Sequence, residues 1–178
     1  ISIFVRHCFC TQTVSTHSIT TMDNTLTIMA IKNCIGKTLL SVSRIQSYYN
    51  DKEDKESMGD LEFTFNDGLF LTLKGAGDAE SIKAENTKGE IYESFQVTDH
   101  SVCSWRLLDL TSDVLWSRLI GQTLRSGEVE WYMDKGVEDR LTACILYFTS
   151  DFLIFYSDES DNNIFSVNVT LPFVDRET

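Results

Sequence analysis

The sequence Ile35-Gly36-Lys37-Thr38-Leu39 occurs twice in this chain, the second time as Ile120-Gly121-Gln122-Thr123-Leu124. A second pair of segments, Leu61-Glu62-Phe63-Thr64 and Leu146-Tyr147-Phe148-Thr149, has the same spacing, since 121 − 36 = 85 and 146 − 61 = 85. A constant offset at separate places predicts two copies of one supersecondary unit. Two copies are too few for a solenoid, so we expect them to pack against each other as the halves of one pseudo-symmetric domain.

The offset also sets the expected domain boundaries. The first repeat covers about 23–98 and the second about 108–173, within a single domain that spans 23–178. This length is sufficient for one well-packed core.

Residues 1–22 precede the first copy, and we expect them to be an extension outside the fold. Met22 or Met29 would then be the natural start of the protein. The apolar run Ile3-Phe4-Val5 is too short for a secretory signal. His7-Cys8-Phe9-Cys10 has no second pair of ligands at a usual spacing, so we predict no metal site there.

Each copy is expected to open with a short helix. In the second copy, Thr111, Ser112 or Asp113 can supply the N-cap oxygen. Gly121, like Gly36 in the first copy, then stands where a helix ends in a left-handed residue. The repeated motif is therefore predicted to be a helix stop followed by the first residues of a strand.

The centre of the first copy has the pattern of a β-hairpin. Apolar and polar residues alternate on both sides of Asn66-Asp67-Gly68. A three-residue loop brings every apolar residue to one face through three pairs: Phe65 with Leu69, Phe63 with Leu71 and Leu61 with Leu73. Gly68 occupies the last loop position, where a left-handed residue is favoured.

The second copy is one residue shorter at the equivalent turn, because Asp151 follows Asp67 by 84 positions. We predict a two-residue Ser150-Asp151 loop there, with Phe148 opposite Leu153 and Leu146 opposite Phe155. That register keeps the apolar residues on a common face.

Further strands are expected at the end of each copy. Alternating apolar residues predict one strand through 165–171, another near Ile82, and an extra one at about Ile91–Val97 that leads toward the second copy. The fold class predicted is α+β, mostly antiparallel β, with two pseudo-symmetric helix-plus-hairpin repeats packed as one β-sandwich-like domain.

The net charge of −12 limits the possible partners. Contact with a phosphate backbone needs clustered Lys and Arg, so we predict no direct nucleic-acid binding. A basic protein partner and simple solubility remain as two explanations of the charge. No apolar run approaches the ~20 residues that span a bilayer, so we predict no membrane partner.

The five cysteines indicate a reducing compartment. Their number is odd and no two form a C-x-x-C pair, which favours the cytosol over a disulfide-forming environment. We expect the three cysteines of the domain 23–178 to be core thiols: Cys34, Cys103 and Cys144.

Patterns that resemble catalytic or ligand-binding motifs are incomplete. Gly36-Lys37-Thr38 lacks the glycine of a phosphate-binding loop, because Ile31 stands in its place. The run from Asp158 lacks the Gly and Glu of a calcium loop. His100 is the one histidine in the expected domain, 23–178, and no nucleophile, base and oxyanion hole can be assembled around it. The chain is therefore predicted to have no catalytic residue, cofactor or metal.

Two aromatic pairs fall near equivalent positions: Tyr48-Tyr49 and Trp131-Tyr132. In a strand, one residue of each pair points outward. These aromatic residues can serve either in core packing or as a contact surface for a protein partner, and the sequence leaves both of these roles open. The mixed charges of 51–56 predict a solvated loop.

The run from Met29 to Lys88 is MAIKNCIGKTLLSVSRIQSYYNDKEDKESMGDLEFTFNDGLFLTLKGAGDAESIKAENTK. It resembles the immunity proteins of bacterial contact-dependent growth inhibition systems, above all those that guard against a nuclease toxin domain. The resemblance continues through the second copy and rests on overall sequence character. It implies a cytosolic antitoxin that binds the C-terminal toxin domain of a cognate surface protein. It also implies that an open sheet edge can accept a toxin β-hairpin, which is β-augmentation.

A nuclease carries a basic substrate face, to which an acidic inhibitor is drawn by complementary potential. We therefore expect the acidic segments 75–100 and 157–163 to border the partner. The candidate contact residues are Glu85, Tyr92, Glu93, Asp99, Asp158, Glu159 and Asp161. Two alternative functions are an acidic regulatory or DNA-mimic binding protein, and a small-ligand carrier that uses the cleft between the two halves.

Overall fold

The computed structural model describes residues 19–54, 59–76, 81–134, 137–157 and 163–168 of the chain. Among these residues the fold is α+β, with one α-helix and mostly antiparallel strands. The elements in chain order are α1 (Ile19–Cys34), β1 (Leu39–Tyr49), β2 (Lys52–Glu53), β3 (Asp60–Phe65), β4 (Phe70–Gly75), β5 (Ile82–Glu85), β6 (Phe95–Thr98), β7 (Ser101–Asp109), the 3₁₀ turn η1 (Trp116–Arg118), β8 (Leu124–Asp134), β9 (Val137–Phe148), β10 (Phe152–Ser157) and β11 (Asn163–Asn168).

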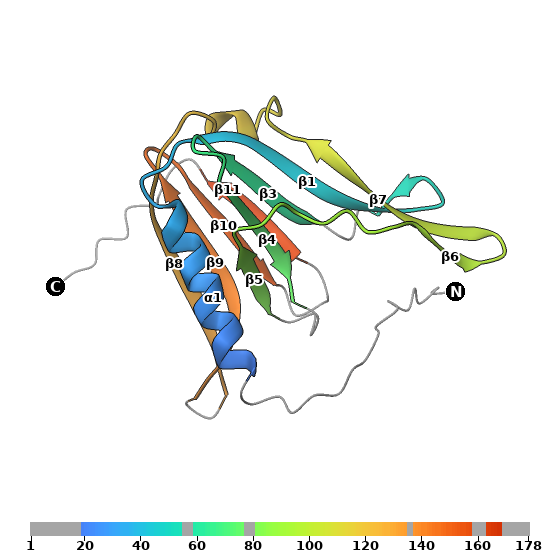
Figure 1. Cartoon of the computed structure of the whole chain (residues 1–178), viewed down its shortest axis with the longest axis horizontal. Helices are drawn as coiled ribbons and strands as arrows, with labels where there is room; N and C mark the ends of the chain where they lie inside the picture. Colours follow the sequence, from blue (N-terminus) through green and yellow to red (C-terminus); the bar gives the residue numbers. More distant parts are fainter. Residues whose placement is uncertain (1–18, 55–58, 77–80, 135–136, 158–162, 169–178) are drawn as a thin grey trace.

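The strands form two antiparallel sheets (Figure 1). The larger sheet has the order β5-β4-β3-β1-β7-β6, and the short β2 pairs with β1 beside this path. The smaller sheet has the order β11-β10-β9-β8. The far half of β1 continues with β7 and β6 into an arm that extends away from α1 (Figure 1), which leaves β6 as an edge strand.

Both sheets and the helix contribute to one buried cluster. α1 contacts β5 and β4 of the larger sheet and β8 and β9 of the smaller one. The cluster has fully buried side chains from each layer. They include Cys34 from α1, Leu39, Val42, Leu61, Phe63, Phe65, Leu71 and Leu73 from the larger sheet, and Leu124, Leu141, Cys144, Leu146, Leu153 and Phe155 from the smaller sheet. The amphipathic alternation of the strands therefore places one face of each sheet in a shared core.

The two copies of the repeated motif bind each other directly. Thr38 and Thr123 form an antiparallel bridge. Around it lie four backbone hydrogen bonds in which the two copies exchange donor and acceptor roles. They are Gly36 N–H to Leu124 O and Gly121 N–H to Leu39 O, both 2.8 Å, and Leu39 N–H to Gln122 O and Leu124 N–H to Lys37 O, both 2.9 Å.

The backbone prediction for the motif is confirmed. Gly36 has φ +84° and Gly121 has φ +80°, so both adopt the left-handed conformation expected after a helix. The short helix expected before Gly121 is wrong in kind, because the segment forms only the 3₁₀ turn η1. Trp116 and Leu119 are its buried residues, whereas Val114 is almost fully exposed, so the apolar face is too narrow for a longer helix.

The register predicted for the first hairpin is confirmed. Leu61 lies opposite Leu73 and Phe63 opposite Leu71. The Phe65 N–H donates to Leu69 O across the three-residue loop, and Gly68 has φ +80°. The requirement that all apolar residues share one face was sufficient to determine this turn.

The register predicted for the second hairpin is wrong by two residues. The structure places Leu153 opposite Leu146, and Phe148 N–H donates to Asp151 O, so the loop is Thr149-Ser150. A shift of two keeps the same face buried, so the apolar pattern does not distinguish the two registers. Contacts outside the hairpin distinguish the two registers. The Ser150 N–H donates to the Gln122 side-chain oxygen, and the Gln122 side-chain amide donates to the Asp151 carboxylate.

Three other expectations need correction. The charged run after Asn50 is not all a solvated loop, since Lys52–Glu53 is β2 and pairs with β1 through a tight turn. The extra strand expected at Ile91–Val97 is β6, which begins only at Phe95. β7 was not anticipated, and α1 begins at Ile19, ahead of the expected domain start at residue 23.

Candidate protein-binding surface

A segment without regular structure crosses the outer face of the larger sheet. We call residues 86–94 the strap; it connects β5 at one edge of the sheet to β6 at the other (Figure 1). The Thr72 hydroxyl of β4 donates to Thr87 O at 2.7 Å. The Gly89 N–H donates to the Glu62 carboxylate of β3, also at 2.7 Å. The strap is thus tied to two strands that it crosses.

Gly89 allows the strap to lie close to the sheet. A Cβ atom at this position would lie 2.4 Å from Cδ1 of Ile45 on β1. Glu62 is buried beneath the strap, and its bond to the Gly89 amide satisfies one of its oxygens. The close approach and the buried acceptor together hold the strap in one position.

Beyond Gly89, every residue from Glu90 to His100 is exposed. The exposed segment carries large apolar side chains, including Tyr92 at 46% and Phe95 at 43% exposure. Both rings pack on Trp105 of β7, with centroids 5.5 Å and 5.7 Å from the indole. Exposed Tyr and Phe side chains packed on a half-buried Trp have the composition of a protein-contact hot spot.

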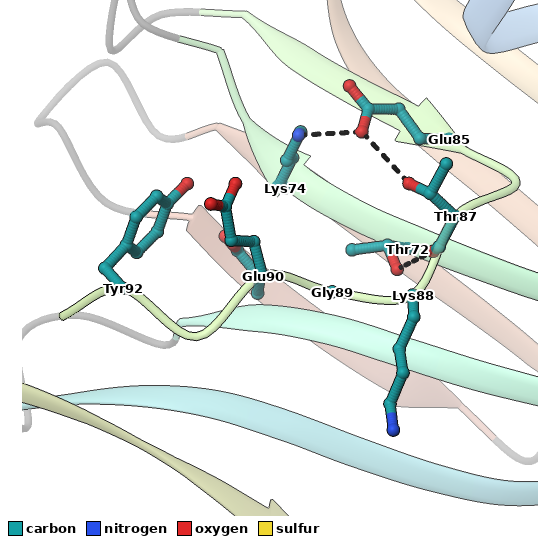
Figure 2. A pocket seen from close by; sticks show the side chains of 9 residues that line it. Thr72, Lys74, Glu85, Thr87, Lys88, Gly89, Glu90 and Tyr92 are labelled. Carbon is teal, nitrogen blue, oxygen red and sulfur yellow. Dashed lines mark hydrogen bonds and ion pairs between the residues drawn. The ribbon is translucent and has the colours of Figure 1, made fainter.

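Two cavities lie beside this aromatic cluster. The larger, of about 400 Å³, is shown in Figure 2 and is bounded by the strap and strands β3, β4 and β5: its lining residues are Asp60, Thr72, Lys74, Glu85, Thr87, Lys88, Gly89, Glu90 and Tyr92. The smaller, of about 170 Å³, is bounded on one side by Trp105. Asp60, Lys74 and Tyr92 line both cavities.

The ionisable groups of the larger cavity influence one another. Burial raises the pKa of Asp60 to about 6; the charge of Lys74 opposes this rise and that of Glu85 adds to it. Lys74 Nζ lies 2.8 Å from a Glu85 carboxylate oxygen. Burial lowers the pKa of Lys74, but the hydrogen bond to Glu85 together with the charges of Glu85, Tyr92 and Asp60 leaves the pKa above its ordinary value. Burial, and then the charge of Asp60, raise the pKa of Tyr92.

The candidate residues from the sequence fall into three places. Glu85 and Tyr92 meet in the larger cavity. Glu93 is exposed on the strap, and Asp99 is exposed in the turn between β6 and β7. Asp158, Glu159 and Asp161 lie outside the described residues.

Sequence reasoning missed Asp60, Glu90 and Trp105. A signal was present for Asp60, because the correctly predicted hairpin register, continued by one pair, sets Asp60 opposite Lys74. Trp105 belongs to β7, whose alternation of exposed and half-buried residues leaves no clean apolar pattern. Its packing against the strap depends on a path that no periodicity predicts.

The remaining candidates are placed as follows. Tyr49 and Tyr132 are exposed, while Arg106 stacks on the half-buried Tyr48 with its guanidinium carbon 4.2 Å from the ring centre. One residue of each aromatic pair thus points outward, as expected. Cys34 and Cys144 are core thiols, but Cys103 is only half-buried, so that prediction is wrong for Cys103.

Searches for other kinds of site add little within the described ranges. There, no group of three Cys, His, Asp or Glu side chains is arranged to hold a metal ion. No helix in this part of the chain is both long and apolar enough to cross a membrane. Comparison with protein-family models, with curated proteins and with solved structures finds no match for this chain.

Proposed function

We propose that this chain is an immunity protein that binds and neutralises a basic nuclease toxin domain by stoichiometric inhibition. The observation that carries the proposal is the strap surface, where an unbroken exposed segment combines aromatic side chains with carboxylates. Interface hot spots are rich in Tyr and Trp, and interfaces with basic partners need negative charge around them. The resemblance of the sequence to immunity proteins supplies the class of partner.

The charge of the chain supports fast capture of such a partner. At −12, the protein attracts a positively charged nuclease over distances of about a Debye length, roughly 10 Å at 0.1 M salt. Glu90, Glu93 and Asp99 are exposed along the strap and the β6–β7 turn, so part of this charge lies beside the aromatic cluster. Steering of this kind raises association rates and sets pairwise specificity.

The free edge of the larger sheet offers a second mode of contact. Within the described part of the chain, β6 pairs with β7 on one side only, and all four of its residues are exposed. An incoming β-strand can bond to such an edge through its main chain, while its side chains reach the aromatic cluster. We therefore place the toxin contact at β6 and the strap, and we propose that the protein acts by binding and not by catalysis.

We also infer that the domain consists of two repeats, about 23–98 and 108–173, packed in a β-sandwich-like arrangement. The reciprocal bonds between Gly36-to-Leu39 and Gly121-to-Leu124 support this inference. So does the parallel between Lys37, which pairs with Asp67, and Gln122, which bonds Asp151. On this view the strap is the last part of the first copy, β7 lies mostly between the two copies, and the partner is bound by what the copies do not share.

The test is co-expression with the nuclease domain encoded by the gene immediately upstream. We expect a stable one-to-one complex on gel filtration and loss of nuclease activity at equimolar protein. A strap variant, Glu90→Lys with Glu93→Lys, should associate more slowly and with weaker salt dependence, whereas Glu130→Lys on β8 should not. If the nuclease domain neither co-purifies nor loses activity, the proposed function is wrong.

The small-ligand alternative has one observation in its favour, the cavity of about 400 Å³. Its lining is mostly charged and polar, whereas carrier sites for small molecules are mostly apolar. The cavity also lies beneath the strap, away from the junction of the two motifs where a cleft was expected. We therefore assign the cavity to recognition of a polar group.

A further inference from the structure

The cavity beneath the strap is lined by more carboxylates than lysines: Asp60, Glu85 and Glu90 against Lys74 and Lys88. Lys74 is already paired with Glu85. Figure 2 shows Lys88 extending away from Glu90 and Lys74. Among the described residues, neither Asp60 nor Glu90 has a hydrogen bond or an ion pair through its carboxylate. Within the described residues, two carboxylates thus line a concave site without an ion pair of their own, although the charge of Lys74 acts on Asp60 from a distance.

The third wall of this site is aromatic. Tyr92 lines both cavities, and its ring meets Trp105 at an interplanar angle of 70°, which fixes the ring from behind. A planar guanidinium binds well where it can stack on an aromatic ring and donate hydrogen bonds to carboxylates in the same site. A lysine ammonium can pair with the carboxylates, but it lacks a planar group that stacks on the ring and donates two parallel hydrogen bonds.

We propose that this cavity receives one arginine side chain of the bound partner, held by Asp60 and Glu90 and stacked on Tyr92. The identity of the partner rests on the proposed function, whereas the chemistry of the cavity can be tested on this chain alone. At about 400 Å³ the cavity lies within the ~300–1,000 Å³ range of sites that hold small organic groups. It is therefore large enough for a guanidinium and its aliphatic stem.

The ionisable groups around Asp60 favour a cation as the ligand of this cavity. The charges that act on Asp60 are those of Lys74 of β4 and Glu85 of β5, and Lys88, Glu90 and Tyr92 of the strap line the same cavity. Their balance leaves Asp60 partly protonated near pH 6. A bound guanidinium favours the ionised carboxylate, so binding releases a proton below about pH 6 and becomes weaker as the pH falls.

The direct experiment is an NMR titration of the ¹⁵N-labelled chain with arginine amide and with citrulline amide, which has a similar shape but no charge. We expect saturable shifts of the Gly89 and Tyr92 amides with arginine amide only. Affinity at pH 5 should be several-fold lower than at pH 7.5. Asp60→Asn and Glu90→Gln should each weaken binding by about fivefold or more, whereas Glu130→Gln, the same charge change on β8, should leave it unchanged.

Other results would overturn the inference. Equal responses to arginine amide and citrulline amide would show that binding in the cavity does not depend on the charge of the ligand. Unchanged affinity in Asp60→Asn would show that this carboxylate does not contact the ligand. Glu90 is exposed on the strap, so its variant is expected to fold in any case and keeps the experiment decisive.

The proposed function and the cavity can fail separately. If the upstream nuclease domain binds wild type and Asp60→Asn equally tightly, the immunity function stands and the arginine pocket is wrong. If arginine amide binds as described but no nuclease domain is captured or inhibited, the pocket stands and the immunity function is wrong. A complex weakened about tenfold or more by Asp60→Asn supports both.

Discussion

Replacing Asp60 with asparagine should make the protein more stable at neutral pH. The carboxylate is half-buried at the start of β3, and burial raises its pKa from 3.8 to about 6. The folded state therefore holds the proton of Asp60 more tightly than the unfolded state does. Between these two pKa values the wild type loses stability as the pH rises, and the full cost is present above about pH 6.

The size of the effect follows from the shift. About two pKa units, at 1.36 kcal/mol each, give an upper limit of about 3 kcal/mol. Asp60 is partly reached by solvent, so we expect Asp60→Asn to raise the free energy of unfolding by about 1–2 kcal/mol at pH 7.5. At pH 4 the wild-type carboxyl is protonated in the folded state, and the gain should shrink to about 0.5 kcal/mol.

Urea unfolding followed by tryptophan fluorescence measures both values. The curves for wild type, Asp60→Asn and the control Glu130→Gln should be recorded at pH 7.5 and at pH 4. The reasoning would be refuted if Asp60→Asn lowered stability at pH 7.5, or if its effect were the same at the two pH values. Under the proposal above, Asp60 costs stability in exchange for ligand binding, a trade-off typical of functional sites.

Three further predictions concern other parts of the fold. Gly59 has φ +68°, and a Cβ there would lie 2.2 Å from the carbonyl oxygen of Ile45, so Gly59→Ala should lower the free energy of unfolding by about 2 kcal/mol or more in urea. Glu62→Leu removes the acceptor of the Gly89 amide and should speed hydrogen exchange at that amide by about tenfold or more, while Glu62→Gln, which keeps an acceptor oxygen, should have a smaller effect. Burial raises the pKa of Cys144 to about 12, so a thiol reagent at pH 8 should label the half-buried Cys103 and spare Cys144 until urea unfolds the chain, as read by peptide mass spectrometry.

Local rules predicted those parts of the fold in which one short segment decides its own conformation. Gly36, Gly68 and Gly121 adopt positive φ because a helix stop or a three-residue turn requires it. The first hairpin has one register that puts all its apolar residues on one face. In these cases the determining residues are neighbours in the sequence, so the pattern is visible without a structure.

The second hairpin was predicted in the wrong register because its determinants are distant. Gln122, nearly thirty positions before the turn, bonds Ser150 and Asp151 and selects one of two registers that bury the same face. The candidate site depends on distant residues as well. The path of the strap depends on Thr72 and Glu62, and neither residue reveals by its own neighbours that a later segment will cross above it.

The bridge between Thr38 and Thr123 has a consequence for how the chain is assembled. Four bonds that exchange donor and acceptor across one point are the arrangement of an isologous interface between two identical subunits. Here both sides belong to one polypeptide, so the translational entropy that two separate subunits lose on association is not a cost of forming this junction. Within one chain the two sides of the junction need not be identical. Lys37 on one side corresponds to Gln122 on the other, and the arm that contains β6 and β7 lies between the two motifs in the sequence.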